Sequence, residues 1–243
     1  MYRRTINILL AVSLSLSLGS AFAQQSDRRD INVQTMEPFQ VFDNVYFVGI
    51  KAVASYVIET SDGLILIDTL DGFDGFTDKL LENIRTVGLN PDDIKHVIVM
   101  QAHRDHYGGL RELKPILTNA TIGMSILDWE RMEGDLGDQA VARDMIVEDR
   151  SSLTLGDTTL NFEHTPGHTA GTTSIIFSVF DDGQEHLTYF HGGSAIRTDV
   201  PDEIQRFIDD LERIQTIPNI EVTLINHHDI VTTGADDLFA REE

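Results

Sequence analysis

Cysteine is absent from this chain of 243 residues. No disulfide can form, and thiolate is excluded both as a metal ligand and as a catalytic nucleophile. Aromatic residues are also few, at 7% of the sequence with a single tryptophan, whereas hydrophobic residues as a whole reach 41%. That hydrophobic fraction is ordinary for a globular protein, so stability must come from one or two packed cores.

Basic residues are also few. The chain has 18 lysine and arginine residues against 40 aspartate and glutamate residues, which gives a formal net charge of -22 at pH 7. A surface of this sign repels the phosphate backbone of DNA and RNA. No nucleic-acid partner is therefore expected.

Long hydrophobic runs are confined to the N-terminus. Arg3-Arg4 precede the apolar run Ile8–Leu18, and Ala21-Phe22-Ala23 supplies small residues before a cleavage point at Gln24. This pattern is typical of a secretory signal peptide, and its apolar core is too short for a membrane span. The sequence therefore predicts export to the periplasm or to the outside of the cell.

This prediction divides the chain into three segments. Residues 1–23 are expected to be the signal peptide, residues 24–38 a flexible polar leader, and residues 39–243 one folded domain. No other apolar run approaches the length that a membrane span needs. The mature protein is therefore expected to lack a membrane span.

The most informative stretch begins at Gln101 and reads Gln-Ala-His-Arg-Asp-His-Tyr-Gly-Gly, directly after the apolar run Val97–Met100. A buried strand that leads into a loop crowded with histidine and aspartate indicates a metal site, because imidazole and carboxylate together suit zinc or a similar divalent ion. Gln101 and His103 are two residues apart, so they point the same way on an extended segment. Asp105 and His106 must turn elsewhere. The spacing favours two adjacent metal ions.

Two further strand ends carry histidine. His168 lies in a loop rich in proline and glycine, between strand-like runs at residues 159–163 and 174–180. His227 directly follows the apolar strand Val222–Asn226. We expect the three loops to converge on one cleft.

These motifs resemble those of the metallo-β-lactamase superfamily. His-x-Asp-His-x-Gly-Gly from His103 is followed by Thr-Pro-Gly-His-Thr around His168 and by Asn226-His227, and Leu64–Thr69 is similar to the family's first motif, a strand that ends in aspartate. The resemblance covers residues 40–230. It is greatest to the β-lactamase subclass that holds its second zinc ion by Asp-His-His.

The resemblance implies up to two zinc ions per chain. The ligands of the first would be Gln101, His103 and His168. The ligands of the second would be Asp105, His106 and His227.

Gln101 departs from the family's pattern, since most members have histidine there. A few enzymes of the subclass also carry glutamine. The amide oxygen is neutral and a weaker donor than imidazole, so the first zinc ion is expected to bind more loosely. At the other end of the chain, His227 is preferred as a ligand over His228 because the family's ligand directly follows asparagine.

Further positions are expected to support the site. Asp68, at the end of its strand, is a candidate to orient a ligand histidine. A loop with His191, Ser194 and Arg197 is the candidate substrate loop, although a structural role for His191 is equally open. His164, His186 and His228 are interpreted as structural or peripheral.

The loop that contains His191 also separates branches of the superfamily. No aspartate occurs between Asp182 and Asp199. Glyoxalase and lactonase branches use a bridging aspartate on this loop, so its absence favours the β-lactamase-like interpretation.

The fold implied is of the α/β class, a four-layer αβ/βα sandwich with the metals at the edge of two packed sheets. Residues 134–139 are expected to form an exposed loop. Apolar periodicity predicts helices over Phe76–Val87, Leu110–Leu117 and Pro201–Ile214. Short apolar or alternating runs predict strands over Phe39–Val48, Ser55–Glu59, Leu64–Ile67, His96–Met100, Thr121–Met124, Leu153–Leu155, Thr159–Glu163, Ser174–Phe180, Leu187–Phe190 and Val222–Ile225.

The function implied is an exported zinc-dependent hydrolase of a small-molecule substrate. Zinc would activate water as a metal-bound hydroxide for attack on a carbonyl carbon, and Asp105 would hold this nucleophile and carry a proton to the leaving group. Opening of a β-lactam or a related amide is the leading expectation, an activity associated with antibiotic resistance. Hydrolysis of another ester, lactone or thioester is the alternative, and a catalytically weak metal-binding protein is a third.

Overall fold

The computed structural model describes residues 28–193 and 195–227, so the predicted signal peptide lies outside the described residues. The chain divides into two compact units, Met1–Thr35 and Met36–Glu243. The described part of the first unit contains one short helix, α2 (Ile31–Gln34). All the other described elements belong to the second unit.

The first sheet of the second unit has seven strands in sequential order. Strands β1 to β4 are antiparallel neighbours, and β4 to β7 are parallel. The strands are β1 (Phe39–Phe42), β2 (Val45–Phe47), β3 (Tyr56–Thr60), β4 (Gly63–Ile67), β5 (Ile94–Ile98), β6 (Thr121–Met124) and β7 (Met145–Ile146). The single strand predicted over Phe39–Val48 is wrong, because the chain reverses between β1 and β2 and pairs Phe39 with Phe47.

The second sheet has five strands in the order β12-β11-β10-β9-β8. Its neighbours are antiparallel except for β11 and β12, which run parallel. The strands are β8 (Ser152–Leu155), β9 (Thr158–His164), β10 (Thr173–Asp181), β11 (Gln184–His191) and β12 (Ile220–Ile225).

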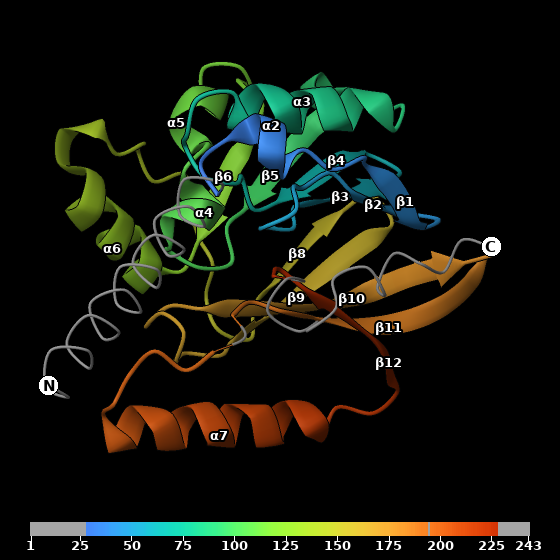
Figure 1. Cartoon of the computed structure of the whole chain (residues 1–243). Helices are drawn as coiled ribbons and strands as arrows, with labels where there is room; N and C mark the ends of the chain where they lie inside the picture. Colours follow the sequence, from blue (N-terminus) through green and yellow to red (C-terminus); the bar gives the residue numbers. More distant parts are fainter. Residues whose placement is uncertain (1–27, 194, 228–243) are drawn as a thin grey trace, which may run out of the picture. The chain divides into compact units, whose positions relative to one another are not determined.

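Helices cover the outer face of each sheet. Figure 1 shows α3 and α5 over the first sheet and α7 over the second, which gives the order helix, sheet, sheet, helix. The predicted four-layer αβ/βα sandwich is therefore confirmed. The helices are α3 (Phe76–Thr86), α4 (Arg104–Tyr107), α5 (Leu110–Leu113), α6 (Ile126–Leu136) and α7 (Pro201–Gln215), with 3-10 turns η1 (Pro91–Asp93) and η2 (Gly137–Gln139). Among the residues of 28–193 and 195–227, no helix is long and apolar enough to cross a membrane.

The main hydrophobic core lies between the two sheets. Ile65 and Ile67 of β4 belong to it, whereas the alternating residues of that strand point to its other face. Tyr56 from the first sheet meets Phe190 from the second edge-on, with ring centroids 5.2 Å apart and planes at 87°. The packing holds the strand ends of both sheets in fixed positions.

Two local predictions are wrong. Residues 134–139 form the end of α6 and the turn η2, not a loop. Helix α6 buries little more than Trp129 and Met132 among apolar residues, so its apolar period is weak. Helix α5 ends at Leu113, short of the predicted Leu117, because Pro115 has no backbone N–H to continue the helix.

Candidate metal centre

Three strand ends meet at one edge of the two sheets. The parallel neighbours β4 and β5 lead into Asp68 and into the loop from Gln101 to His106, and β12 leads into His227. The Asp68 backbone N–H donates to the Ile98 carbonyl at 2.9 Å, which ties the first two ends together. The Ala54 backbone N–H donates to the carbonyl of Asn226, the residue before His227, at 2.9 Å. The loop from Gln101 to His106 and the loop of His227, two of the three that were expected to converge, therefore meet at this edge.

Asp105, His106 and His227 form a compact group whose ligand atoms all lie within 4.8 Å of one another. The Nε2 atoms of His106 and His227 are 3.0 Å apart. Asp105 Oδ2 lies 3.4 Å from Nε2 of His227 and 3.9 Å from Nε2 of His106. Both histidines are buried, and the aspartate is partly exposed. Two imidazole nitrogens and one carboxylate oxygen are a donor set that zinc accepts.

Hydrogen bonds on the far side of each ring fix the tautomers of this group. His106 Nδ1 donates to Asp68 Oδ2 at 2.7 Å, and His227 Nδ1 donates to the Ala52 carbonyl at 2.9 Å. Because these oxygens can only accept, each neutral ring presents the lone pair of Nε2 to the group. Two lone pairs that face each other at this separation repel unless a cation lies beside them. The donor set therefore fits a divalent metal.

Charges in the group also favour a cation. Burial by itself lowers the pKa of the His106 ring, but the carboxylates of Asp68, Asp105 and Asp128 together hold this pKa above its usual value. Burial by itself raises the pKa of the Asp105 carboxyl, but His106, His227, a backbone hydrogen bond and His103 together hold this pKa below its usual value. Asp105 is therefore ionised and His106 attracts positive charge.

Gln101 lies between the two expected metal sites. Its side chain is fully buried. Its Oε1 accepts from His103 Nδ1 at 2.5 Å, and its Nε2 donates to His106 Nε2 at 2.8 Å. The amide thus connects one residue expected at the first site with one expected at the second.

His103 and His168 lie together beyond Gln101. Their rings meet edge-on with centroids 4.7 Å apart and planes at 88°. Burial lowers the pKa of His103 to about 3, with His168, Arg131 and Arg197 acting in the same direction. Burial also lowers the pKa of His168 to about 4, although its hydrogen bond to the Ala195 carbonyl, at 2.7 Å, opposes the shift. Both rings are therefore neutral at physiological pH, the state in which imidazole binds a metal.

Asp68 lies where a residue that orients His106 should lie. Its side chain is fully buried, and its Oδ1 accepts from the Met100 backbone N–H at 2.9 Å while Oδ2 accepts from His106. Its φ of 60° is in the left-handed region, which aspartate tolerates better than most residues. The carboxylate therefore joins the end of β5 to the ring of His106.

Asp128 is a supporting residue that the sequence interpretation missed. Its carboxylate is buried on α6 and accepts three hydrogen bonds from the two histidine-bearing loops. The donors are the Ala102 backbone N–H at 3.0 Å, the Thr169 hydroxyl at 2.8 Å and the Gly171 backbone N–H at 3.2 Å. Asp128 therefore holds the loop of His103 against the loop of His168. The local signal was Ser125-x-x-Asp128, a capping-box pattern whose Ser125 hydroxyl accepts from the Asp128 N–H at 3.3 Å.

The residues of the expected substrate loop are dispersed. His191 Nδ1 is 2.9 Å from the Tyr189 hydroxyl, and with Tyr189 and Ile214 it lines a cavity of about 620 Å³ between α7 and the second sheet. The ring of His191 therefore borders this cavity. Ser194 lies outside the described residues. Arg197 lies beside His168, and its backbone N–H donates to the Gly167 carbonyl at 2.7 Å.

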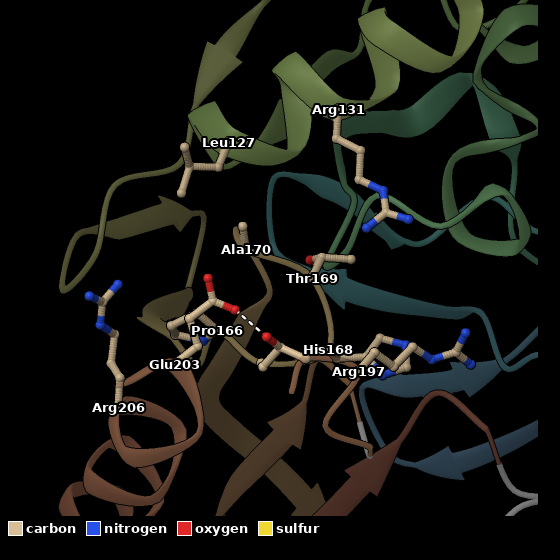
Figure 2. Close-up of a pocket in the computed structure, with 11 residues that line it drawn as sticks. Leu127, Arg131, Pro166, His168, Thr169, Ala170, Arg197, Glu203 and Arg206 are labelled. Carbon is tan, nitrogen blue, oxygen red and sulfur yellow. Dashed lines mark hydrogen bonds between the residues drawn. The ribbon is translucent and has the colours of Figure 1, made fainter. Parts of the chain in front are cut away.

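A second cavity, of about 410 Å³, opens beside His168 (Figure 2). Residues of α6, of the His168 loop, of the loop before α7 and of α7 itself line it. They are Leu127, Arg131, Pro166, Gly167, His168, Thr169, Ala170, Arg197, Thr198, Glu203 and Arg206. A small molecule in this cavity would contact one of the expected metal ligands.

The hydrogen bonds of Asp128 give a testable consequence for stability. In Asp128→Asn, one carboxylate oxygen becomes an NH₂ group that faces donors, so we expect the free energy of unfolding to fall by roughly 1–3 kcal/mol. Urea denaturation followed by circular dichroism measures this change. The control is Asp138→Asn, an exposed position in η2, which should leave the midpoint unchanged. Equal midpoints for the two variants would show that Asp128 does not hold the loops together.

Comparison with known proteins agrees with this geometry. The family model described as the metallo-beta-lactamase superfamily matches residues 48–183. BJP-1, a subclass B3 metallo-β-lactamase of Bradyrhizobium japonicum, has a similar structure with 31% sequence identity and a TM-score of 0.71, over 81% of this chain and 80% of that chain. The metallo-β-lactamase GOB-18 from Elizabethkingia meningoseptica is 26% identical, with a TM-score of 0.71 over 83% of this chain and 82% of that chain.

A more distant structure shows the same fold. FEZ-1 from Legionella gormanii is 23% identical, with a TM-score of 0.71 over 81% of both chains. The family match spans more than half of the chain, and the Asp-His-His group of the structure fits the subclass that the sequence resembles. The family match and the structural similarity confirm the expectation of a metallohydrolase. The chain belongs to the metallo-β-lactamase superfamily.

Proposed function

We propose that this protein is a zinc-dependent hydrolase that opens β-lactams or related amides. The observation that carries the proposal is the group of Asp105, His106 and His227, in which two lone pairs and an ionised carboxylate face one another. The similarity to the subclass B3 enzyme of Bradyrhizobium japonicum and to a class B3 di-zinc enzyme from an Alaskan soil metagenome supports zinc as the metal and a β-lactam as the first substrate to test.

The ligand assignment follows from the donor atoms. Zinc would be held by Asp105 Oδ2, His106 Nε2 and His227 Nε2, and a second zinc ion by the pair His103 and His168 with Gln101. Zinc bound in such sites supplies a Lewis acid and lowers the pKa of a bound water.

The residues of the chain have distinct tasks in this proposal. Asp105 is ionised and partly exposed, so it orients the attacking water and carries its proton to the leaving nitrogen. Asp68 holds the His106 ring with Nε2 inward. Asp128 positions the loops of His103 and His168, as a hydrogen-bonded carboxylate behind a ligand commonly does.

One observation favours a second candidate, a metal-binding protein with weak turnover. The Gln101 amide is engaged with His103 and His106, and its oxygen is a weaker metal donor than imidazole. In that case zinc binds and no substrate of a screen covering β-lactams, lactones and thioesters is hydrolysed. Chelator-sensitive hydrolysis of a lactone or thioester alone would support the alternative hydrolase and contradict the β-lactam assignment.

Substitution of the proposed ligands tests the hydrolase directly. His106→Ala and His227→Ala should each reduce kcat/KM for a chromogenic cephalosporin, or for whatever substrate the screen finds, by at least about a hundredfold. Each substitution removes one of the three metal donors of the site. Removal of zinc by a chelator should have the same effect and be reversed by added zinc. Turnover that survives both treatments would contradict metal-dependent catalysis.

Two histidines outside the cluster provide matched controls for these variants. His164 contacts the Val147 carbonyl at 3.1 Å, and His186 pairs with Glu221. His164→Ala and His186→Ala should leave most of the activity. His228, which the sequence interpretation also set aside, lies outside the described residues.

Unequal metal sites are the second prediction of the proposal. The site of Asp105, His106 and His227 should fill before the site that contains Gln101, because glutamine is a neutral and weak donor. Gln101→His should raise the zinc stoichiometry measured by competition with a chromophoric chelator at limiting zinc. Two equally tight zinc ions in the unmodified protein would contradict it.

We also propose export of the protein. The proposal rests on the N-terminal sequence, in which Arg3-Arg4, Ile8–Leu18 and Ala21-Phe22-Ala23 form a signal-peptide pattern. Mass spectrometry of the periplasmic or secreted fraction should find Gln24 as the first residue. An intact chain beginning at Met1 in the cytoplasm would contradict export.

A further inference from the structure

Three arginines of this acidic chain lie at one cavity, and none of them forms an ion pair with a carboxylate in the described part of the chain. Several basic side chains elsewhere pair with acidic ones, as Arg104 does with Asp71 and Arg143 with Glu133. Arg131, Arg197 and Arg206 instead line the cavity beside His168, and among residues 28–193 and 195–227 none of the three is in an ion pair. A chain with 40 acidic residues has many partners to offer, so three free guanidinium groups in one cavity indicate an anionic ligand.

The three groups come from different elements and face different parts of the cavity. Arg131 lies on α6, Arg197 in the loop before α7, and Arg206 on α7. Figure 2 shows Arg206 at one end of the cavity and Arg131 and Arg197 toward the other, with Arg197 beside His168. Arg131 and Arg197 also both act electrostatically on the His103 ring, so both lie close to the metal centre.

The one acidic residue of the cavity does not neutralise this set. Glu203 carries one negative charge against the three positive charges, and it forms no ion pair with Arg206 in the described part of the chain; its Oε2 accepts a hydrogen bond from the Thr198 hydroxyl at 2.5 Å. Leu127, which is exposed, adds an apolar surface to the lining. The cavity thus combines separated cationic groups with an apolar wall.

We propose that the substrate of the hydrolase is at least dianionic, with one oxyanion between Arg131 and Arg197 and a second at Arg206. The inference rests on the proposed function, since it assigns the substrate class of the same site. Guanidinium groups bind carboxylate and phosphate oxygens through paired hydrogen bonds, and these two groups share the required chemistry. A cavity of about 410 Å³ suits a ligand of small-molecule size.

Binding of simple sulfonates to the zinc-loaded protein tests the number of anionic contacts without turnover. Sulfonate is a poor zinc ligand, so butane-1,4-disulfonate and butane-1-sulfonate report on the arginines and not on the metal. Isothermal titration calorimetry should find the disulfonate bound about tenfold more tightly, the ratio expected for one additional charged hydrogen-bonded contact.

Arginine variants locate each contact. Arg206→Gln should remove the preference for the disulfonate and leave the affinity for the monosulfonate unchanged. Arg131→Gln and Arg197→Gln should each weaken both probes about tenfold. Arg85→Gln provides the matched control, since Arg85 is an exposed arginine of α3 that does not line the cavity and its substitution removes the same charge.

Three outcomes would overturn the inference: no binding at millimolar concentration, equal affinities for the two probes, or an equal loss in Arg85→Gln. Comparison of adipate with the bisphosphate of butane-1,4-diol on zinc-free protein then distinguishes carboxylate from phosphate. Failure of this inference can be distinguished from failure of the proposed function. A protein that binds the disulfonate and hydrolyses nothing contradicts only the hydrolase, and an active hydrolase without preference for dianions contradicts only this inference.

Discussion

The hydrogen bond between the buried Asp68 carboxylate and the His106 ring is the interaction on which the metal centre depends. Both side chains are fully withdrawn from water, and a buried carboxylate costs several kcal/mol unless charge and hydrogen bonds compensate it. The Met100 N–H and the His106 ring supply the hydrogen bonds. The positive charge must come from a proton or a metal beyond the ring. The burial of Asp68 therefore fixes the tautomer of His106 and favours a cation among His106, His227 and Asp105.

The architecture supplies these groups from both sheets, so the site depends on the packing between them. His106 follows a strand of the first sheet and His227 follows a strand of the second. Their rings lie with centroids 5.0 Å apart only because the core between the sheets holds the two strand ends at that distance. Asp128 adds a link outside the core, since it joins the loops of His103 and His168 through three hydrogen bonds. The site therefore requires both sheets to be folded and packed together.

Much of the fold and of the ligand cluster could be predicted from the sequence, because strand ends are local features. The apolar run before Gln101 and the strand before His227 place the ligands at strand termini, and the structure has them there. The Ser125-x-x-Asp128 pattern indicates only the start of α6, and the link that Asp128 makes between the loops could not be predicted because its contact with Thr169 spans 41 positions. The orientation of the Gln101 amide likewise depends on its neighbours. Helix α6 was missed because tertiary contacts of a few buried residues, and not an apolar period, hold it in place.

The position of the first zinc ion tests the proposed metal centre most directly. Crystals grown with less than one equivalent of zinc per chain, measured at the zinc absorption edge, give an anomalous peak wherever the ion binds most tightly. We expect one peak within about 2.0–2.2 Å of Asp105 Oδ2, His106 Nε2 and His227 Nε2, the usual distances for zinc with oxygen and nitrogen ligands. A first peak between His103 and His168, or no peak near His106, would contradict it.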